Sequence, residues 1–140
     1  SPASSRNGRG ADVTGPRPAF TVSRAHLFAA ALIGAAGVAL LAAGAHAAGA
    51  QAATAGQMLL FHACAAMAAT LARKAGSLHD GIARVAIVAL MLGAALFAGD
   101  LTLRAFSGAR LFAMAAPLSG GLTILGWLGI ALSALVRGRA

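Results

Sequence analysis

The chain has 140 residues, of which 59% are hydrophobic and only 10% are charged. A soluble domain carries roughly 25% charged residues, so this composition excludes an ordinary soluble protein and predicts an all-α integral membrane protein. The net charge of +8 would suit nucleic-acid binding. However, the eleven Lys and Arg residues stand in short clusters beside apolar runs, which is typical of contacts with lipid headgroups. We therefore expect the lipid bilayer, and no nucleic acid, as the partner of these charges.

Residues 1–23 form a polar tail rich in Ser, Gly, Pro and Arg. The prolines at positions 2, 16 and 18 block regular helix, so the tail alone is expected to be disordered. Docking on a partner protein is the role expected for it.

Residues 25–72 are free of Asp, Glu, Lys and Arg. As one straight helix this segment would be about 72 Å long, more than twice the thickness of the bilayer core. It must therefore fold back, and its glycines together with Gln51 and Thr54 place the turn within residues 47–56. A secretory signal peptide, cleaved at small residues such as 48–50, is the alternative interpretation.

The next apolar run follows a polar linker at residues 73–84 and contains Asp100. This acid lies about 24 Å along the helix from Arg84 and one turn before Arg104. An interfacial ion pair between Asp100 and Arg104 is the favoured interpretation. An ion or proton site, for which an acid within a membrane span is a candidate, is the alternative.

The last apolar run extends from Leu111 to Val136 without a charge, between Arg110 and Arg137. Pro117 has no N–H to donate and suits the first position of a helix, so the span is predicted to begin there. The four predicted spans are residues 26–46, 57–71, 85–103 and 117–136, within a transmembrane domain at 24–140.

Basic residues predict the orientation of these spans. With the N-terminus in the cytoplasm, nine cations lie on that side: Arg6, Arg9, Arg17, Arg24, Arg73, Lys74, Arg84, Arg137 and Arg139. Only Arg104 and Arg110 lie on the other side. The excess of cations on the cytoplasmic side predicts a four-helix bundle in the bacterial inner membrane with both termini cytoplasmic.

Small residues in the spans predict tight helix packing, because lipid offers no hydrophobic drive for helices to associate. The residues expected at helix contacts are Gly34, Gly37, Gly44, Gly93, Gly99, Pro117, Gly120, Gly126, Trp127 and Gly129. The indole N–H of Trp127 needs a partner such as a carbonyl or a hydroxyl. Cys64 is interpreted as a small buried hydrophobe.

His46 and His62 are the only candidates for binding a cofactor. His46 closes the first predicted span, whereas His62 lies about 8 Å deeper in the second. A haem would need both side chains at one depth, so hydrogen-bonded packing is favoured and no cofactor or metal is expected. The chain also lacks a phosphate-binding Gly loop, paired carboxylates and Cys/His zinc spacing. These observations favour a protein that is not an enzyme.

Several short motifs resemble those of the YgdD-like family. They are G-A-H at residues 44–46, F-H at 61–62, F-A-G-D-L at 97–101, P-L-S-G-G at 117–121 and G-W at 126–127. This family comprises small four-helix membrane proteins of uncharacterised function in bacterial inner membranes, with a small transmembrane relative in mitochondria. The resemblance covers residues 32–135 and matches at His46, His62, Gly99, Pro117, Gly120, Gly126 and Trp127. It departs at Ala98, Asp100, Thr102, Ala116 and Ser119. It implies the fold and topology, and no reaction.

Two functions remain open from the sequence. The first is an accessory or structural subunit bound to a larger membrane complex, respiratory or photosynthetic. The second is a protein that binds a small molecule (quinone, lipid or haem) or an ion-conducting bundle. In either case the site would be lined by His46, His62, Asp100 and Trp127.

Overall fold

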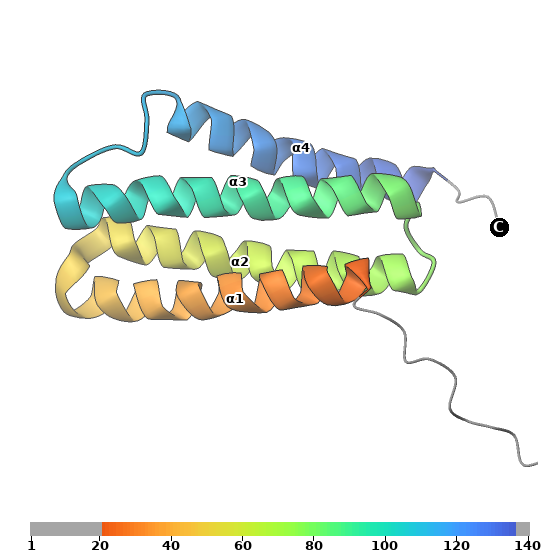
Figure 1. Ribbon diagram of the computed structural model, residues 1–140, viewed down its shortest axis with the longest axis horizontal. Coiled ribbons are helices and arrows are strands. Elements are labelled where there is room, and N and C mark those ends of the chain that lie inside the picture. The colour runs from red at the N-terminus through yellow and green to blue at the C-terminus, as the bar shows by residue number, and fades with distance from the viewer. Residues whose placement is uncertain (1–20, 137–140) are drawn as a thin grey trace, which may run out of the picture.

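A computed structural model of the chain describes residues 21–136, in which every regular element of secondary structure is a helix (Figure 1). The α-helices are α1 (Val22–Ala43), α2 (Gly49–Lys74), α3 (Asp80–Ser107) and α4 (Ala115–Leu135), and a short π-helix, η1 (Gly44–Ala48), joins α1 to α2. The all-α prediction is confirmed.

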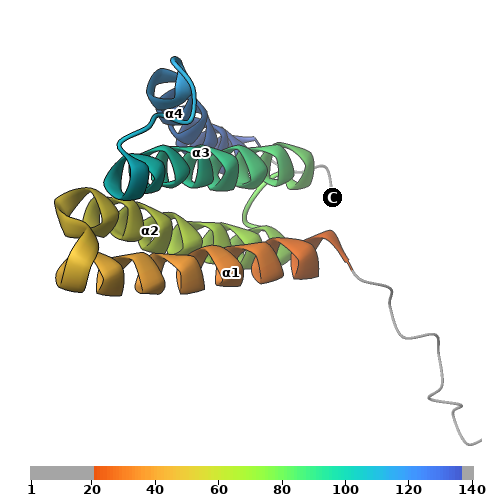
Figure 2. The same cartoon turned by 60° about the vertical axis from the view of Figure 1, so that its left-hand side comes forward.

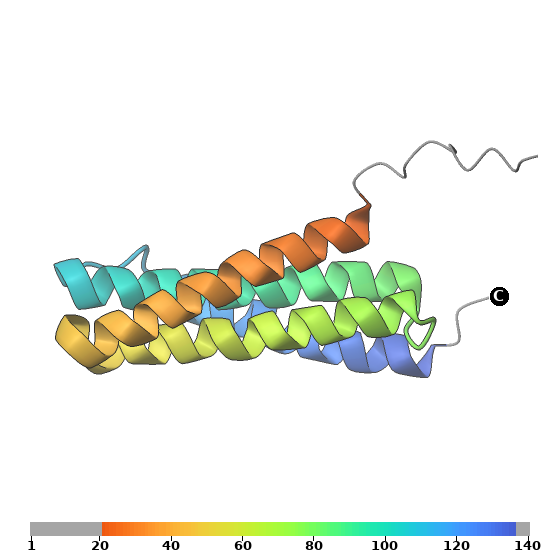
Figure 3. The same cartoon turned by 90° about the horizontal axis from the view of Figure 1, so that it is seen from below.

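The helices are stacked in chain order. α1 packs against α2, α2 against α3 and α3 against α4, so that α1 and α4 are outermost (Figure 2). α1 runs obliquely to α2 and α3 (Figure 3). This oblique path leaves lateral grooves between α1 and α3.

The two ends of the stack differ in charge. α1 begins, α2 ends, α3 begins and α4 ends at one end, which we call the basic end (Figure 1). It carries Arg24, Arg73, Lys74 and Arg84, whereas the distal end carries Arg104 and Arg110. The other five basic residues in the predicted count lie outside the described residues.

Three helical segments of the described chain are long and apolar enough to span a membrane, which indicates a membrane protein. They are Val22–Lys74, Asp80–Ser107 and Ala115–Leu135. Four spans were predicted, whereas the structure gives three such candidate segments. The physical reason is that α1, η1 and α2 follow one another without a loop and form a single helical segment of 53 residues.

The chain reverses direction inside this first segment, at Gly49. Its φ of 69° and ψ of −165° belong to a region of backbone conformation that is essentially open only to glycine. The turn thus falls within the predicted residues 47–56, but α2 begins at Gly49 rather than at residue 57. Thr54, interpreted as a loop residue, is instead accommodated in the helix because its hydroxyl donates to the Ala50 carbonyl at 2.9 Å.

The start of α4 also differs from the prediction. The helix begins at Ala115, so Pro117 is its third residue and not its first. Proline is tolerated at either position, because the first N–H groups of a helix have no partner within it.

The interior consists mainly of alanine. One cluster joins Ala30, Ala66, Ala69, Ile87 and Met91, and a second joins Ala55, Leu59, Ala94 and Ala98. Many large apolar side chains point outward instead, among them Phe61, Val85 and Leu135. Cys64 is exposed, contrary to the interpretation of a buried hydrophobe. An apolar exterior around a small-residue interior fits a protein whose solvent is lipid.

Candidate functional site

A buried arginine organises the polar groups at the basic end. The guanidinium of Arg73, whose side chain is 4% exposed, donates to Asp80 Oδ1 at 2.5 Å and to Ser23 Oγ at 2.6 Å. Arg84 donates to the second oxygen of Asp80 at 2.7 Å. These contacts tie α1, α2 and α3 together, and they leave two guanidinium charges against one carboxylate.

Capping residues explain why the helices begin here. The Thr21 hydroxyl accepts the N–H of Arg24, and His79 Nδ1 accepts the N–H of Ile82, each at 3.4 Å. The backbone N–H of His79 donates to the Ser133 carbonyl at 2.8 Å, and this bond joins the start of α3 to the end of α4. His79 is therefore structural at this position.

Asp100 lies at the distal end and is 2% exposed. Arg104 Nη2 donates to one of its oxygens at 2.5 Å, and the Leu111 N–H donates to the other at 2.9 Å. Both oxygens are thus occupied by the protein itself. The carboxylate anchors the loop between α3 and α4, and the structure provides no argument for an ion or proton site there.

His62 and Trp127 meet across α2 and α4. The Trp127 indole N–H donates to His62 Nε2 at 3.4 Å, and the two rings meet edge to face with centroids 6.1 Å apart. His62 Nδ1 lies 2.7 Å from the Met58 carbonyl. A carbonyl only accepts and an indole N–H only donates, so these partners assign a neutral imidazole with its proton on Nδ1. The expected partner of Trp127 was a carbonyl or a hydroxyl, and it is a histidine.

The two histidines proposed as cofactor candidates do not converge. His46 is exposed in η1 at the turn, whereas His62 is buried about 20 Å along α2 from Gly49. The predicted difference of 8 Å was too small because α2 begins earlier than expected. Within residues 21–136, no group of three His, Cys, Asp or Glu side chains could hold a metal ion.

Glycines at helix contacts separate into two groups. A Cβ on Gly37, Gly44 or Gly126 would meet backbone atoms of the neighbouring helix at 2.6–2.9 Å, and Gly93 likewise lies against Thr123 and Ser119 of α4. A Cβ on Gly34 or Gly129 would have only an alanine side chain within 3.5 Å. Gly99 and Gly120, also predicted at contacts, have no atom within 4 Å of a Cβ.

Gly56 is a contact residue that the sequence interpretation missed. A Cβ there would lie 2.6 Å from the Gly37 carbonyl oxygen. It was assigned to the turn because the second span was expected to begin after it. Its spacing from Ala52, Leu59 and Ala63, which are buried on the same helix, is the signal that could have placed it in a helix.

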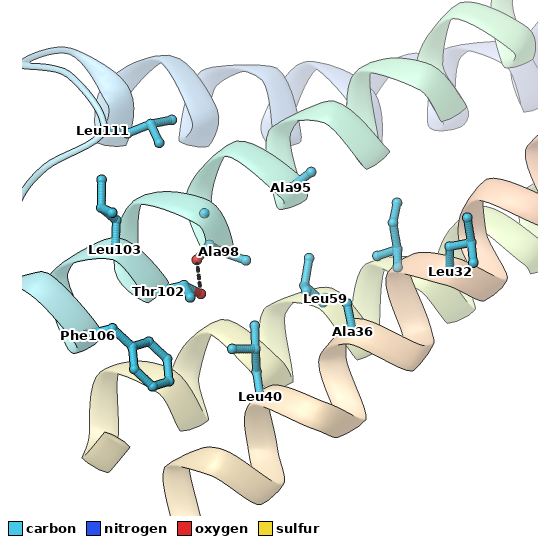
Figure 4. Close-up of a pocket in the computed structure, with 12 residues that line it drawn as sticks. Leu32, Ala36, Leu40, Leu59, Ala95, Ala98, Thr102, Leu103, Phe106 and Leu111 are labelled. Carbon is cyan, nitrogen blue, oxygen red and sulfur yellow. Dashed lines mark hydrogen bonds between the residues drawn. The ribbon is translucent and has the colours of Figure 1, made fainter. Parts of the chain in front are cut away.

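A groove of about 530 Å³ opens between α1 and α3 and is drawn in Figure 4. We call it the apolar groove. It is lined by Leu32, Ile33, Ala36, Leu40, Leu59, Ala95, Ala98, Gly99, Thr102, Leu103, Phe106 and Leu111. Thr102 alone among these has a polar side chain, and its hydroxyl donates to the Ala98 carbonyl of its own helix at 2.6 Å (Figure 4). The groove therefore offers apolar contact and no free polar group.

One comparison with known proteins identifies a relationship. The family model described as "Protein of unknown function (DUF423)" matches residues 33–120, which extend from α1 into the start of α4. Neither the curated proteins nor the solved structures contain a match to the chain.

Proposed function

The chain belongs to the DUF423 family, and we propose that it serves as a non-catalytic accessory or structural subunit bound to a larger membrane complex. The observation that carries this proposal is the apolar groove. A groove with no free polar group suits neither catalysis nor selective binding of a polar substrate. It suits a transmembrane helix of a partner protein.

The lining of the apolar groove supports a helix as its occupant. The lining includes the small residues Ala36, Ala95 and Gly99. Small residues of this kind permit close backbone approach between helices in lipid. Leu32 and Phe106 line the same groove and are 56% and 62% exposed. Such side chains provide the interdigitating contacts that hold helices together where water is absent.

The small-molecule and ion-conducting alternatives placed at His46, His62 and Asp100 receive no such support. His46 is exposed at the turn, His62 is held by Met58 and Trp127, and Asp100 is held by Arg104 and the neighbouring loop.

We also propose that the chain crosses the bacterial inner membrane four times, as in the YgdD-like proteins, with the basic end in the cytoplasm. The reversal at Gly49 supports two crossings by the first segment, since α1 and α2 measure about 33 Å and 39 Å and the bilayer core about 30 Å. Reporter fusions at Gly49, Gly76 and Gly108 test this. An external signal at Gly76, or a cytoplasmic one at Gly49 or Gly108, contradicts the topology.

The accessory role is tested by native gel electrophoresis of membranes solubilised in gentle detergent. The protein is expected to migrate within a larger complex, and Gly99→Leu is expected to release it by filling the apolar groove. Gly121→Leu is the matched control, because a Cβ at either glycine meets no atom within 4 Å, and Gly121 does not line this groove. Migration of the wild-type protein alone contradicts the proposal.

A separate truncation tests the proposed docking of the tail, whose residues 1–20 lie outside the described part. Residues 1–20 are removed and Thr21 is kept, because Thr21 caps α1. Loss of the complex on truncation supports docking by the tail, whereas an unchanged complex assigns the contact to the helices.

A further inference from the structure

A second groove at the basic end combines apolar walls with two polar side chains. Its volume is about 400 Å³, and we call it the Arg84 groove. It is lined by Val22, His26, Arg84, Val85, Val88, Ala89, Leu92 and Leu122, so that α1, α3 and α4 all contribute. It shares no residue with the apolar groove.

His26 is the unusual member of this lining. The residue is 6% exposed, and its Nδ1 atom is buried without a hydrogen-bond partner. Within residues 21–136, only two other buried side-chain nitrogen or oxygen atoms share this state, and both are arginine Nε atoms. Buried polar groups are normally hydrogen-bonded, so an exception beside a groove points to a ligand that supplies the missing partner.

Arg84 gives the same groove a positive charge. Its guanidinium has five N–H donors, of which Asp80 engages one on Nη2. Asp80 also pairs with the buried Arg73, so the three groups together carry one net positive charge. The side chain of Arg84 is 46% exposed and can reach a ligand.

The polar and apolar parts of the groove lie at different depths. His26 and Arg84 each lie four residues, about 6 Å, from the start of their helices at the basic end. Val85, Val88 and Leu92 continue about 12 Å further along α3. A ligand that fits this order has a charged head at the level of the helix ends and a hydrocarbon tail that runs inward.

We propose that the Arg84 groove binds a phospholipid with a net negative headgroup, such as phosphatidylglycerol. The phosphodiester accepts hydrogen bonds from Arg84 and His26, and an acyl chain lies along Val85, Val88 and Leu92. Charge complementarity selects an anionic lipid over a zwitterionic one, since the surrounding groups are positive in sum. This inference stands apart from the accessory role, because it uses a different groove and needs no partner protein.

The test is native mass spectrometry of the purified full chain in detergent, titrated with phosphatidylglycerol, phosphatidylcholine or inorganic phosphate. Phosphatidylglycerol is expected to bind most tightly. Arg84→Gln is expected to weaken it about tenfold, the usual scale for losing a charge-assisted hydrogen bond. Arg104→Gln is the matched control, since each arginine pairs with an aspartate four residues earlier and Arg104 lies at the distal end.

A second pair of variants keeps the test independent of the ion pairs. Val88→Trp fills the apolar part of the groove and is expected to reduce lipid binding, whereas Val38→Trp, at an exposed valine outside this groove, is not. If phosphatidylcholine binds as tightly as phosphatidylglycerol, the proposed selectivity for an anionic lipid is wrong. Equally tight binding of inorganic phosphate, or full lipid binding by Val88→Trp, overturns the site. Circular dichroism of each variant confirms that it is folded.

Discussion

Substitution of Gly126 by alanine tests the packing of α4 on α3. A Cβ at Gly126 would lie 2.7 Å from the Leu90 N atom and 2.8 Å from the Leu90 Cα atom. Ordinary contact begins at 3.4 Å, so the two helices must separate locally by about 0.7 Å. Both obstructing atoms belong to the backbone of a helix, which cannot move aside as a flexible side chain can. The contact between α3 and α4 around Gly126 is therefore expected to open.

The size of the effect follows from this separation. A gap of about 0.5–1 Å forfeits roughly a quarter to a half of each dispersion contact that it opens, and overpacking of this kind costs about 1–3 kcal/mol. Alanine also has a higher helix propensity than glycine, by up to about 1 kcal/mol. Gly121→Ala on the same helix receives the same gain but meets no atom within 4 Å. The difference between the two variants thus isolates the contact with α3.

The assay is equilibrium unfolding of the purified protein in mixed micelles, with loss of helix followed by circular dichroism. Gly126→Ala is expected to be less stable than Gly121→Ala by about 1–3 kcal/mol, which is about a 5- to 150-fold change in the unfolding equilibrium constant. Equal stability of the two variants would refute the reasoning, because it would mean that α3 and α4 do not approach as closely as the glycine requires.

Three further substitutions test other parts of the structure. Gly49→Ala should lower the free energy of unfolding by about 1–3 kcal/mol in the same titration, because its positive φ disfavours alanine; an unchanged value would argue against the turn. Trp127→Phe should lower the free energy of unfolding by about 0.5–1.5 kcal/mol, since it removes the N–H donated to His62 and keeps an aromatic ring. An unchanged free energy of unfolding would argue against that hydrogen bond. Asp80→Asn should lower the thermal midpoint by leaving the buried Arg73 without its counter-ion, and an unchanged midpoint would contradict this role.

The sequence alone predicted the features that depend on composition and local pattern. Apolar runs indicated an all-helical membrane protein, and the length of the run from Ala25 to Ala72 required a reversal of the chain. Glycine-rich residues located that reversal, which the structure places at Gly49. These inferences succeed because length, hydropathy and glycine conformation are properties of the chain itself.

The tertiary structure decided which residues of these helices meet. Nothing local distinguishes Gly126, which touches α3, from Gly120, which faces open space, or His26, which is buried, from His46, which is exposed. In a soluble helix the apolar face marks the interior, but here the faces toward lipid and toward other helices are both apolar. Packing between helices, and not the pattern of any one helix, therefore sets the rotation of each helix about its axis. The two grooves and the environment of His26 follow from that rotation.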